Sequence, residues 1–321
     1  MRIRLAISLA LVAAATALPA RAATNVPHLD HVFVIVEENT KYSAIVGNTF
    51  EAPYFNGLAN AHVRADNYYG ISHVSLGNYI GMVSGQIPQP LDHGDCPTYT
   101  LCVRPGPTIA KQLGDAGDTW RGYFESMQAP CAHPTGLTDP NQSGYLTRHD
   151  PFVYFSEIVN DAPYCSAHVV PYESNFAASL QAGPASFSFI VPNSCNDGHD
   201  PGCAGNTSQV RNIDRWLSVN VPPILDYINT HARSALFITF DEAATTDTSS
   251  CCDQAPLVQG GGHVGFLMVG SADIQAPAGT RVTAPANHYS LLRTIEDGFG
   301  LAPLGEAGIP VLQAPMTGLF S

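Results

Sequence analysis

The fold is decided by residues 31–39, which read His-Val-Phe-Val-Ile-Val-Glu-Glu-Asn. The continuous apolar run over residues 32–36 suits a strand that is buried on both faces, as in a sheet covered by helices on both sides. The run stops at Glu37, Glu38 and Asn39, so polar side chains follow directly at the carboxyl end of a buried strand. These residues predict a central strand that leads into a site.

The pattern of apolar strands and helices repeats along the chain. Further strands are predicted over residues 119–124, 186–191, 235–240 and 264–269. Helices are predicted over residues 53–63, 75–84, 107–114, 173–181 and 289–299, and over 210–231 with an interruption at Pro222 and Pro223. Strands that alternate with helices indicate one α/β domain around a largely parallel sheet.

The N-terminal segment resembles a secretory signal. Residues 1–23 combine Arg2 and Arg4, an apolar run over residues 7–18 and small residues at 20–22. A membrane anchor is the alternative, but the run is short for a bilayer span. We therefore expect a secreted or periplasmic protein whose single domain, residues 24–321, contains loop-rich insertions at about 86–106 and 126–167.

Eight cysteines support export, because an even number in an exported chain indicates disulfides. The short separations favour the pairs Cys96–Cys102 and Cys195–Cys203. We expect Cys251 and Cys252 to pair elsewhere, because a bond between adjacent residues is strained. A cysteine zinc site is the rival interpretation, although the chain has no pair of Cys-x-x-Cys motifs.

Composition narrows the range of functions. The chain has 321 residues, of which 45% are hydrophobic and 13% charged, so it can bury a large core. Its formal net charge is -13, which argues against a nucleic-acid partner, because phosphate backbones repel an acidic surface. A phosphate-bearing ligand would have to be held locally, by a cation, backbone amides or histidines.

Polar residues follow several predicted strands and are expected to converge on one edge of the sheet. These are Glu38 and Asn39 after the first strand, Asn193, Asp197 and His199 after the strand 186–191, and Asp241 and Glu242 after the strand 235–240. His263 precedes the strand 264–269 and joins this edge if that strand is antiparallel. Clustered carboxylates repel one another unless a cation lies between them. Oxygen ligands favour magnesium, calcium or manganese, and the histidines leave zinc or iron open.

A second informative segment is residues 73–79, which read His-Val-Ser-Leu-Gly-Asn-Tyr. Ser75 stands where a helix is expected to begin, and a helix N-terminus favours an anion. Its hydroxyl is either a helix cap or a nucleophile activated by a cation. His73 lies beside it, and Asn78 follows one helical turn later.

Together these segments resemble the phosphoesterase family of bacterial acid phosphatases and phospholipases C, in the alkaline phosphatase-like superfamily. The residues that carry the resemblance are 37–39, 52–59, 73–79, 84–85, 148–152, 191–193, 197–200, 240–242, 262–264 and 287–297. The resemblance spans nearly the whole mature chain, and within the family it is strongest to secreted acid phosphatases. It implies a three-layer α/β sandwich with a small loop-rich cap.

The resemblance also implies roles for individual residues. A divalent metal cation would be held by Glu38, Asn39, Ser75, Asp241 and Glu242. Ser75 would be the nucleophile, with Asn78, His199 and His263 as the other catalytic residues. His73, His149, Asn193, Asp197 and His288 are candidates for contacts with phosphate or for supporting positions around the site.

The expected function is a secreted, metal-dependent acid phosphatase that hydrolyses phosphate monoesters through a phosphoserine. A phospholipase C-type diesterase is the alternative, and an inactive exported binding protein or a sulfatase fits the residues less well. The substrate would be a phosphorylated small molecule or a phosphoinositide, without nucleic acid and without stable membrane insertion. The sequence defines neither the natural substrate nor the oligomeric state.

Overall fold

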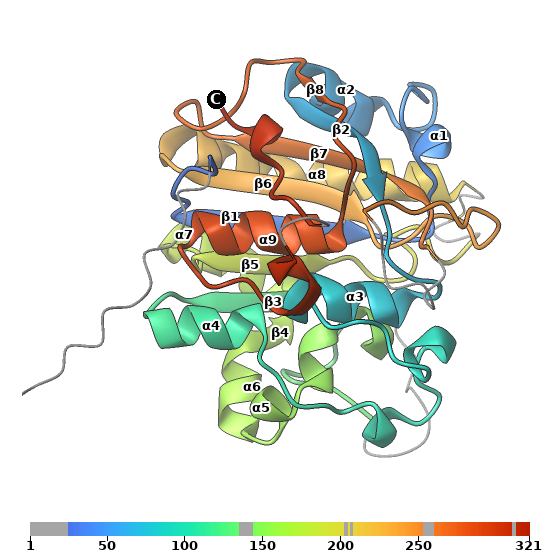
Figure 1. Cartoon of the computed structure of the whole chain (residues 1–321), viewed down its shortest axis with the longest axis vertical. Helices are drawn as coiled ribbons and strands as arrows, with labels where there is room; N and C mark the ends of the chain where they lie inside the picture. Colours follow the sequence, from blue (N-terminus) through green and yellow to red (C-terminus); the bar gives the residue numbers. More distant parts are fainter. Residues whose placement is uncertain (1–24, 135–143, 202–204, 206–207, 253–259, 310–312) are drawn as a thin grey trace, which may run out of the picture.

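A computed structural model describes residues 25–134, 144–201, 205, 208–252, 260–309 and 313–321 (Figure 1). The predicted signal segment, residues 1–23, lies outside the described residues. The strands are β1 (His31–Glu37), β2 (Val63–Tyr69), β3 (Trp120–Phe124), β4 (Val169–Pro171), β5 (Phe187–Val191), β6 (Ser234–Phe240), β7 (His263–Gly270), β8 (Arg281–Val282) and β9 (Ala286–Asn287).

The helices alternate with these strands for much of the chain. They are α1 (Tyr42–Ile45), α2 (Pro53–Ala61), α3 (Ser75–Ser84), α4 (Ile109–Ala116), α5 (Ser156–Val159), α6 (Ala162–His168), α7 (Tyr172–Ala182), α8 (Gln209–Thr230) and α9 (His288–Gly298). Short 3-10 helices are η1 (Asp92–Gly94), η2 (Tyr99–Leu101), η3 (Thr147–His149), η4 (Pro151–Tyr154), η6 (Gly305–Gly308) and η7 (Thr317–Leu319).

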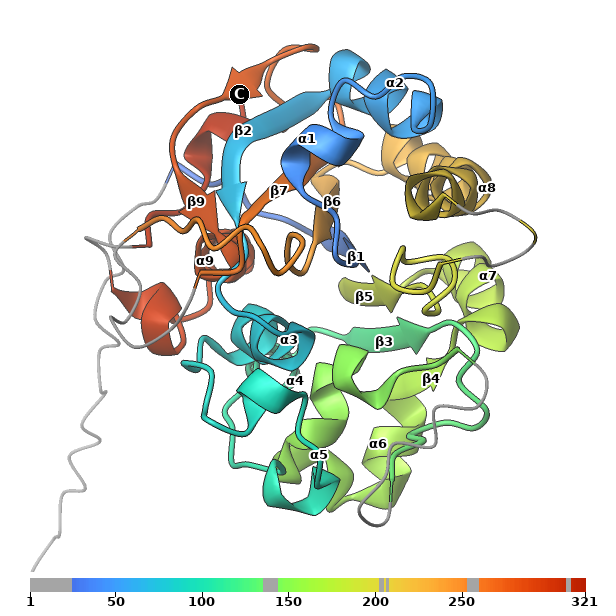
Figure 2. The same ribbon diagram turned by 90° about the vertical axis from the view of Figure 1, so that its right-hand side faces the viewer.

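Within the described residues the strands form one sheet in the order β4-β3-β5-β1-β6-β7-β2-β8, with β9 also beside β2. All neighbours pair in parallel except β7, which runs antiparallel to both β6 and β2. Helices α3, α4 and α9 cover one face and α2, α7 and α8 the other (Figure 2). The three-layer α/β sandwich expected from the sequence is therefore confirmed.

The centre of the sheet is buried because strands β1, β5 and β6 lie between the two helix layers. Every residue of β5 and β6 is buried, and so is every residue of β1 after His31. Their carboxyl ends all leave the sheet at the same edge, on the right in Figure 1. The polar residues that follow these strands are thereby brought to one edge.

Two predictions of secondary structure were wrong. Helix α8 runs unbroken from Gln209 to Thr230 with Pro222 and Pro223 inside it. Its buried residues continue on both sides of the prolines, from Ile213 to Ile228, so packing against the sheet outweighs the missing backbone donors. Strand β2 was missed altogether, because its sequence Val-Arg-Ala-Asp-Asn-Tyr-Tyr lacks the apolar run of a central strand.

The insertion expected to be loop-rich, residues 126–167, is partly helical. It contains η3, η4, α5 and α6, and it leaves residues 135–143 outside the described part of the chain. Helices α5 and α6 lie beside β3 and β4 at one end of the sheet (Figure 2). The insertion matters for the site because η3 carries His149 inward.

The described cysteines are disulfide-bonded, which excludes a thiolate zinc site built from them. Cys96 pairs with Cys102 as expected, and Cys131 pairs with Cys165. Cys195 is also bonded, while Cys203 lies outside the described residues. The expectation for Cys251 was wrong, because it pairs with its neighbour Cys252 in a turn where Cys252 adopts a φ of 68°.

A search for membrane-crossing helices among the described residues finds none of sufficient length and apolarity.

Candidate active site

Three carboxylates form the centre of the site. Strands β1 and β6 pair in parallel with Glu37 opposite Phe240, so Glu38 leaves the sheet beside Asp241 and Glu242. One carboxylate oxygen from each of Glu38, Asp241 and Glu242 lies within 4.8 Å of the others. All three side chains are buried. Sequence reasoning predicted this convergence of strand ends.

The electrostatics of the cluster call for a cation. Burial raises the pKa of Asp241 well above its usual value, and the nearby charge of Glu38 raises it further. Burial likewise raises the pKa of Glu242 to about 7. Oε2 of Glu38 and Oδ2 of Asp241 are buried without a hydrogen-bond partner. Buried, unpartnered carboxylate oxygens at this spacing fit a divalent metal ion.

Asn39 connects the two strand ends. Its backbone amide donates to Oδ1 of Asp241 at 3.2 Å, and its side-chain amide donates to Oε1 of Glu38 at 2.8 Å. The residue adopts a φ of 50°, in the left-handed region that asparagine tolerates better than most residues. Asn39 is therefore held against the carboxylates of Glu38 and Asp241.

Ser75 is the first residue of α3 and is buried. Its Oγ donates a hydrogen bond of 2.7 Å to Oε1 of Glu38. Helix α3 has ten residues, and Ser75 lies at its N-terminus, the positive end of the helix dipole. The structure thus joins the predicted nucleophile to the predicted cation site.

Asn78 shapes the turn that presents Ser75. Its Oδ1 accepts from the backbone amides of Ile71 and Ser72 at 2.8 and 3.0 Å. Its Nδ2 donates to the carbonyl oxygen of Ser72 at 2.9 Å. As one of the predicted catalytic residues, Asn78 would need this amide group for the substrate, but both ends of the group hydrogen-bond the backbone before α3. Asn78 acts here by fixing the position of Ser75.

His149 lies near Oε1 of Glu38, the oxygen that accepts the hydrogen bond from Ser75. Its Nδ1 is 3.2 Å from Oδ2 of Asp197, and its Nε2 is 3.5 Å from Oε1 of Glu38. Although burial opposes a positive charge, the carboxylates of Glu38 and Asp197 raise the pKa of His149 to about 9. In turn, the imidazolium helps to hold the pKa of Glu38 below its usual value against the effect of burial. The ring also stacks on Tyr79, with centroids 5.0 Å apart.

His73 is fixed on the opposite side of the carboxylates. Its Nδ1 is 2.6 Å from Oε2 of Glu242, and its Nε2 donates to the carbonyl oxygen of Asp247 at 2.8 Å. Burial opposes protonation of His73, but the hydrogen bond with Glu242 raises its pKa above the usual value. His73 therefore orients Glu242.

His199 lies at the more open side of the site, with 30% of its side chain exposed. Its ring centroid is 6.0 Å from that of His149. Nδ1 is 2.8 Å from Oδ1 of Asp200, and Nη2 of Arg148 is 3.1 Å from Nε2. Because arginine only donates, Nε2 accepts in this contact and Nδ1 carries the proton toward Asp200.

Two residues were not singled out from the sequence. Asp95 accepts a 3.0 Å hydrogen bond from the backbone amide of Leu76 in the first turn of α3. Its other oxygen is 3.4 Å from Nε of Arg148. Arg148 stands next to His149 in a motif that the family resemblance used, so it could have been found. Asp95 lies in a Pro- and Cys-rich loop that offered no signal.

The predicted catalytic residue His263 lies in other surroundings. The ring of His263 stacks between Tyr42 and Tyr69 and hydrogen-bonds the carbonyl oxygen of Asp66, although β7 is antiparallel as the prediction required. Among the described residues we find no contact of this ring with the carboxylates of the cluster. The position of His263 therefore does not support its predicted catalytic role. Its strand end reaches the edge, but its side chain faces the aromatic pair.

His288 and Asn193 contact the backbone of residues that form or lead to the site. Nε2 of His288 donates to the carbonyl oxygen of Asp241 at 2.5 Å, and its Nδ1 lies 2.9 Å from the hydroxyl oxygen of Tyr68. Burial lowers the pKa of His288 to about 4, so it is neutral and suited to this pair of contacts. Asn193 accepts from the backbone amides of Cys195 and Asn196 and shapes the loop that leads to Asp197.

Comparison with known sequences identifies relatives over most of the chain. The model of the Phosphoesterase family matches residues 49–302. The phosphatidylinositol-3-phosphatase of Mycobacterium tuberculosis is 29% identical over 286 residues, which cover 89% of this chain and 82% of that protein. The phosphate-repressible acid phosphatase of Penicillium chrysogenum is 29% identical over 303 residues, which cover 91% of this chain and 65% of that protein.

Solved structures share the architecture. A protein of the alkaline phosphatase superfamily from Vibrio parahaemolyticus has a TM-score of 0.58 at 12% identity, covering 88% of this chain and 70% of its own. Murine ectonucleotide pyrophosphatase/phosphodiesterase 5 has a TM-score of 0.53 at 12% identity, covering 91% of this chain and 100% of its own. At these identities the likeness concerns the fold alone. The match to the family model over most of the chain goes further: the chain belongs to the Phosphoesterase family, with an alkaline phosphatase-like fold.

Proposed function

We propose that the protein is a metal-dependent acid phosphatase that hydrolyses phosphate monoesters through a phosphoserine on Ser75. It is an enzyme of the phosphoric monoester hydrolase class, in keeping with relatives that are named phosphatases. The single observation that carries the proposal is the hydrogen bond from Ser75 Oγ to Glu38 at the start of α3, inside the carboxylate cluster. A hydroxyl in that position is what a cation-activated nucleophile requires.

The cation would be held by Glu38, Asn39, Ser75, Asp241 and Glu242. When bound, it would stabilise the alkoxide of the serine and the negative charge of the phosphoryl oxygens, and oxygen ligands favour magnesium, calcium or manganese. The proposal rests on the buried, unpartnered oxygens of Glu38 and Asp241. The imidazolium of His149 supplies a positive charge on the other side of Glu38, so one metal ion suffices.

The chain's own residues would then divide the reaction into two steps. Ser75 attacks phosphorus in line with the leaving alcohol, and the new phosphoserine is hydrolysed by water in the second step. His199 is the proposed proton shuttle to the leaving oxygen, because it reaches solvent and Asp200 fixes its ring. Its Nε2, which accepts from Arg148 in this structure, would take up a proton from solvent when Arg148 turns to the phosphoryl group, and would pass that proton to the leaving oxygen. In the second step the same imidazole takes a proton from water. Arg148 is placed to meet phosphoryl oxygens beside His199.

The proposed substrate is a phosphomonoester on a small molecule or a phosphoinositide, following the name of the mycobacterial relative. The described disulfides Cys96–Cys102 and Cys131–Cys165 support export, because such bonds persist in oxidising compartments. We therefore propose that residues 1–23 are a cleaved signal and that the enzyme acts outside the cytoplasm.

The test compares a chromogenic phosphate monoester with its bis-ester and with a phosphocholine ester, before and after chelation. We expect monoester cleavage that chelation abolishes and that Ser75→Ala eliminates. Ser84→Ala is the matched control, because Ser84 is a buried serine at the other end of the same helix. Preferred cleavage of the diesters would instead make the protein a phospholipase C-type enzyme, and full activity of Ser75→Ala would remove Ser75 as nucleophile.

A further inference from the structure

Asp95 links two parts of the site that are far apart in the sequence. Its Oδ1 accepts a 3.0 Å hydrogen bond from the backbone amide of Leu76, the residue after Ser75. Its Oδ2 lies 3.4 Å from Nε of Arg148, in an ion pair. Nη2 of Arg148 in turn lies 3.1 Å from Nε2 of His199. One carboxylate therefore connects the start of α3 with the arginine beside His199.

The backbone at Asp95 adopts a conformation that its surroundings must hold. Asp95 has a φ of 51° and Cys96 a φ of 52°, so two successive residues other than glycine lie in the left-handed region. Such a conformation costs free energy and persists only where neighbouring contacts impose it, which happens most often at functional sites. The contacts of the surrounding loop therefore fix the place of the Asp95 carboxylate.

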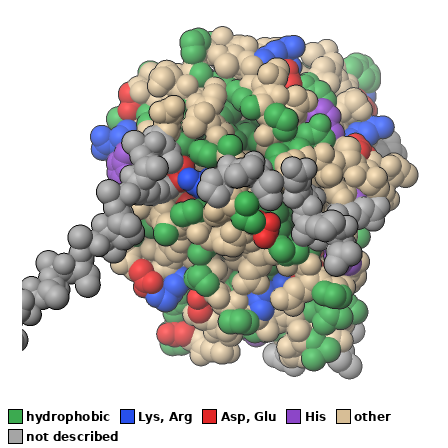
Figure 3. Space-filling model, viewed as in Figure 1, with side chains coloured by type: hydrophobic (Ala, Val, Ile, Leu, Met, Phe, Trp, Pro, Cys, Tyr) green, Lys and Arg blue, Asp and Glu red, His purple; other side chains and the backbone are tan. Residues whose placement is uncertain are grey.

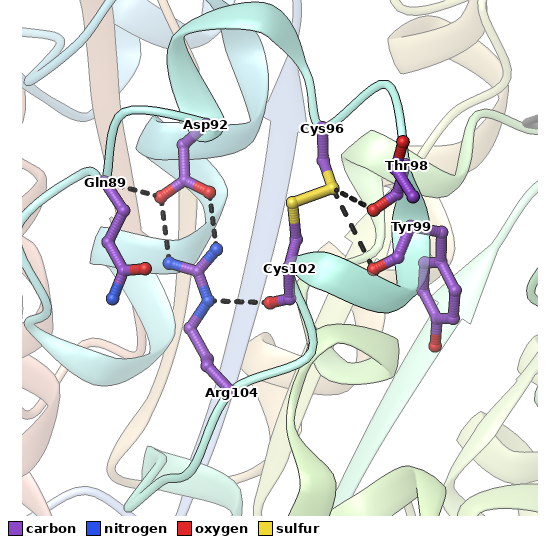
Figure 4. The surroundings of a disulfide bond; sticks show 7 residues. All are labelled: Gln89, Asp92, Cys96, Thr98, Tyr99, Cys102 and Arg104. Atoms are coloured by element: carbon purple, nitrogen blue, oxygen red, sulfur yellow. Dashed lines mark hydrogen bonds and ion pairs between the residues drawn. A yellow bond between two sulfur atoms is a disulfide. The ribbon is translucent and has the colours of Figure 1, made fainter. Parts of the chain in front are cut away.

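A disulfide and a buried ion pair hold this loop, as Figure 4 shows. Cys96 is bonded to Cys102, and the carbonyl oxygen of Cys102 accepts from Nε of Arg104 at 3.0 Å. Nη1 of Arg104 donates to Oδ2 of Asp92 at 2.8 Å, and both side chains are buried. The backbone amide of Asp95 donates to the carbonyl oxygen of Asp92 at 3.0 Å. Asp95 is thus fixed to the loop on both sides.

Positive charge is scarce in this protein, so the position of one arginine matters. The chain has 14 Lys and Arg residues against 27 Asp and Glu residues. On the face drawn in Figure 3, Lys and Arg side chains are scattered, with acidic side chains between them. A phosphate monoester carries close to two negative charges at neutral pH, and a guanidinium group suits its oxygens. Arg148, with 16% of its side chain exposed, supplies such a group close to Ser75.

We propose that Asp95 is a positioning residue that holds Arg148 by its Nε and so directs the guanidinium group toward a phosphoryl group at Ser75. The inference rests on the proposed function for the identity of the reaction. Nη2 can then turn from His199 to a phosphoryl oxygen while Nε stays on Asp95. An arginine that is held before the substrate arrives loses less side-chain entropy on binding.

The charge of Asp95 is favoured by the same contacts. Burial raises the pKa of Asp95, whereas the hydrogen bond from the Leu76 amide and the charge of Arg148 oppose that rise. Both partners of Asp95 therefore favour the carboxylate form, which is the form that attracts a guanidinium group.

The alternative is that Asp95 serves only as a cap of α3. Asp214 is the matched control for that role, because it accepts from the backbone amides of Tyr54 and Phe55 in the first turn of α2. Among the residues that the structure describes, Asp214 forms no ion pair with a basic side chain. Asp214→Asn therefore changes a similar acceptor at a helix start without affecting an arginine.

The test measures phosphate binding and catalysis separately, on the mature chain. Calorimetry with magnesium, calcium and manganese in turn gives the dissociation constant of inorganic phosphate. Initial rates with a soluble chromogenic monoester give kcat and KM. The variants are Asp95→Asn, Arg148→Gln, the two together, and Asp214→Asn. Asparagine tolerates a left-handed φ and keeps an oxygen that accepts from Leu76, but it has no charge for Arg148.

Asp95→Asn should weaken phosphate binding and lower kcat/KM by roughly tenfold, because Arg148 is no longer held. Arg148→Gln should lower kcat/KM by roughly 100-fold. Adding Asp95→Asn to Arg148→Gln should cause no further loss, because residues that act through one contact are not additive. Asp214→Asn should keep the wild-type values. Additive losses in the double variant would overturn the proposal, and so would wild-type phosphate affinity in Asp95→Asn.

Arg148→Lys examines the same contact and leaves Asp95 and its bond to Leu76 unchanged. Lysine keeps the positive charge, but it cannot be held at one nitrogen while it presents others to the phosphate. We expect phosphate affinity roughly tenfold or more below that of the wild type. Wild-type affinity in this variant would show that charge alone suffices and would also overturn the proposal.

The two readouts separate this inference from the proposed function. If Asp95→Asn weakens phosphate binding but the wild type hydrolyses no monoester, the proposed function fails while the role of Asp95 stands. If the wild type hydrolyses the monoester and Asp95→Asn binds phosphate and turns over equally well, the role of Asp95 fails alone. A wild type that neither binds phosphate nor hydrolyses the monoester would overturn both.

Discussion

Glu37 and Glu38, neighbours at the end of β1, differ in function because only Glu38 faces the carboxylate cluster. Glu38 faces Ser75, Asp241 and Glu242, whereas Glu37 points to the other face of the sheet, as successive side chains of a strand do. Burial raises the pKa of Glu37 well above its usual value, so its side chain is neutral. The sequence Glu-Glu-Asn could not by itself say which glutamate serves the site, and the family resemblance decided it.

Exchanging each glutamate for glutamine tests this division of roles. Glu38→Gln should lose most of the divalent cation affinity and the phosphatase activity, because it removes a charged ligand and the acceptor of Ser75. Glu37→Gln should keep both, because a neutral side chain replaces another of the same shape. Calorimetric titration with magnesium, calcium and manganese, beside the activity assay, measures the difference. Equal cation binding by the two variants would show that the ligand set is wrong.

At the scale of elements, strand ends were predictable and side-chain directions were not. The apolar runs of β1, β5 and β6 predict buried parallel strands. Because the strands are parallel, their carboxyl ends meet at one edge of the sheet. The position of the His263 ring could not be predicted, because its stacking on Tyr42 and Tyr69 depends on β2. That strand has a polar sequence and was not predicted. The course of α8 through its two prolines was likewise decided by packing, which a local sequence pattern does not contain.

The start of η4 contains a pH-dependent element that lies outside the cation site. Asp150 is buried, and burial raises its pKa to about 8. Tyr145 lies 2.9 Å from its Oδ2 and also donates to the carbonyl oxygen of Ala132. A tyrosine has one hydroxyl proton, so a protonated Asp150 completes the chain by donating to Tyr145. This arrangement favours the neutral acid in the folded protein.

The free energy of unfolding should therefore fall as pH rises from about 4 to about 8. The folded state keeps a proton on Asp150 in that window while the unfolded state loses it, so ionisation works against folding. Asp150→Asn keeps a donor toward Tyr145 and cannot ionise. Relative to this variant, the wild type should lose on the order of 3–4 kcal/mol between about pH 5 and about pH 8 in urea unfolding. Parallel curves for the two proteins would contradict a protonated Asp150.

At the scale of the whole molecule, the cation should act as part of the fold. The three carboxylates connect the ends of β1 and β6 in the middle of the sheet, where their repulsion destabilises the chain without a cation. A ligand at 100 times its dissociation constant stabilises the folded state by about 2.7 kcal/mol. We expect chelation to lower the thermal midpoint by roughly 5–10 °C and added divalent cation to restore it. A thermal midpoint that stays unchanged after chelation of the wild type would oppose this account.

The central claim is that Ser75 carries the phosphoryl group between two displacements. The most direct measurement is the stereochemical course of hydrolysis, with a phosphorothioate monoester made chiral at phosphorus by sulfur and two oxygen isotopes and cleaved in water that carries the third isotope. Each in-line displacement inverts the configuration, so two successive displacements give net retention. The account predicts retention for the wild type and no turnover for Ser75→Ala. Net inversion would mean that water attacks the substrate directly, and it would contradict the phosphoserine on Ser75.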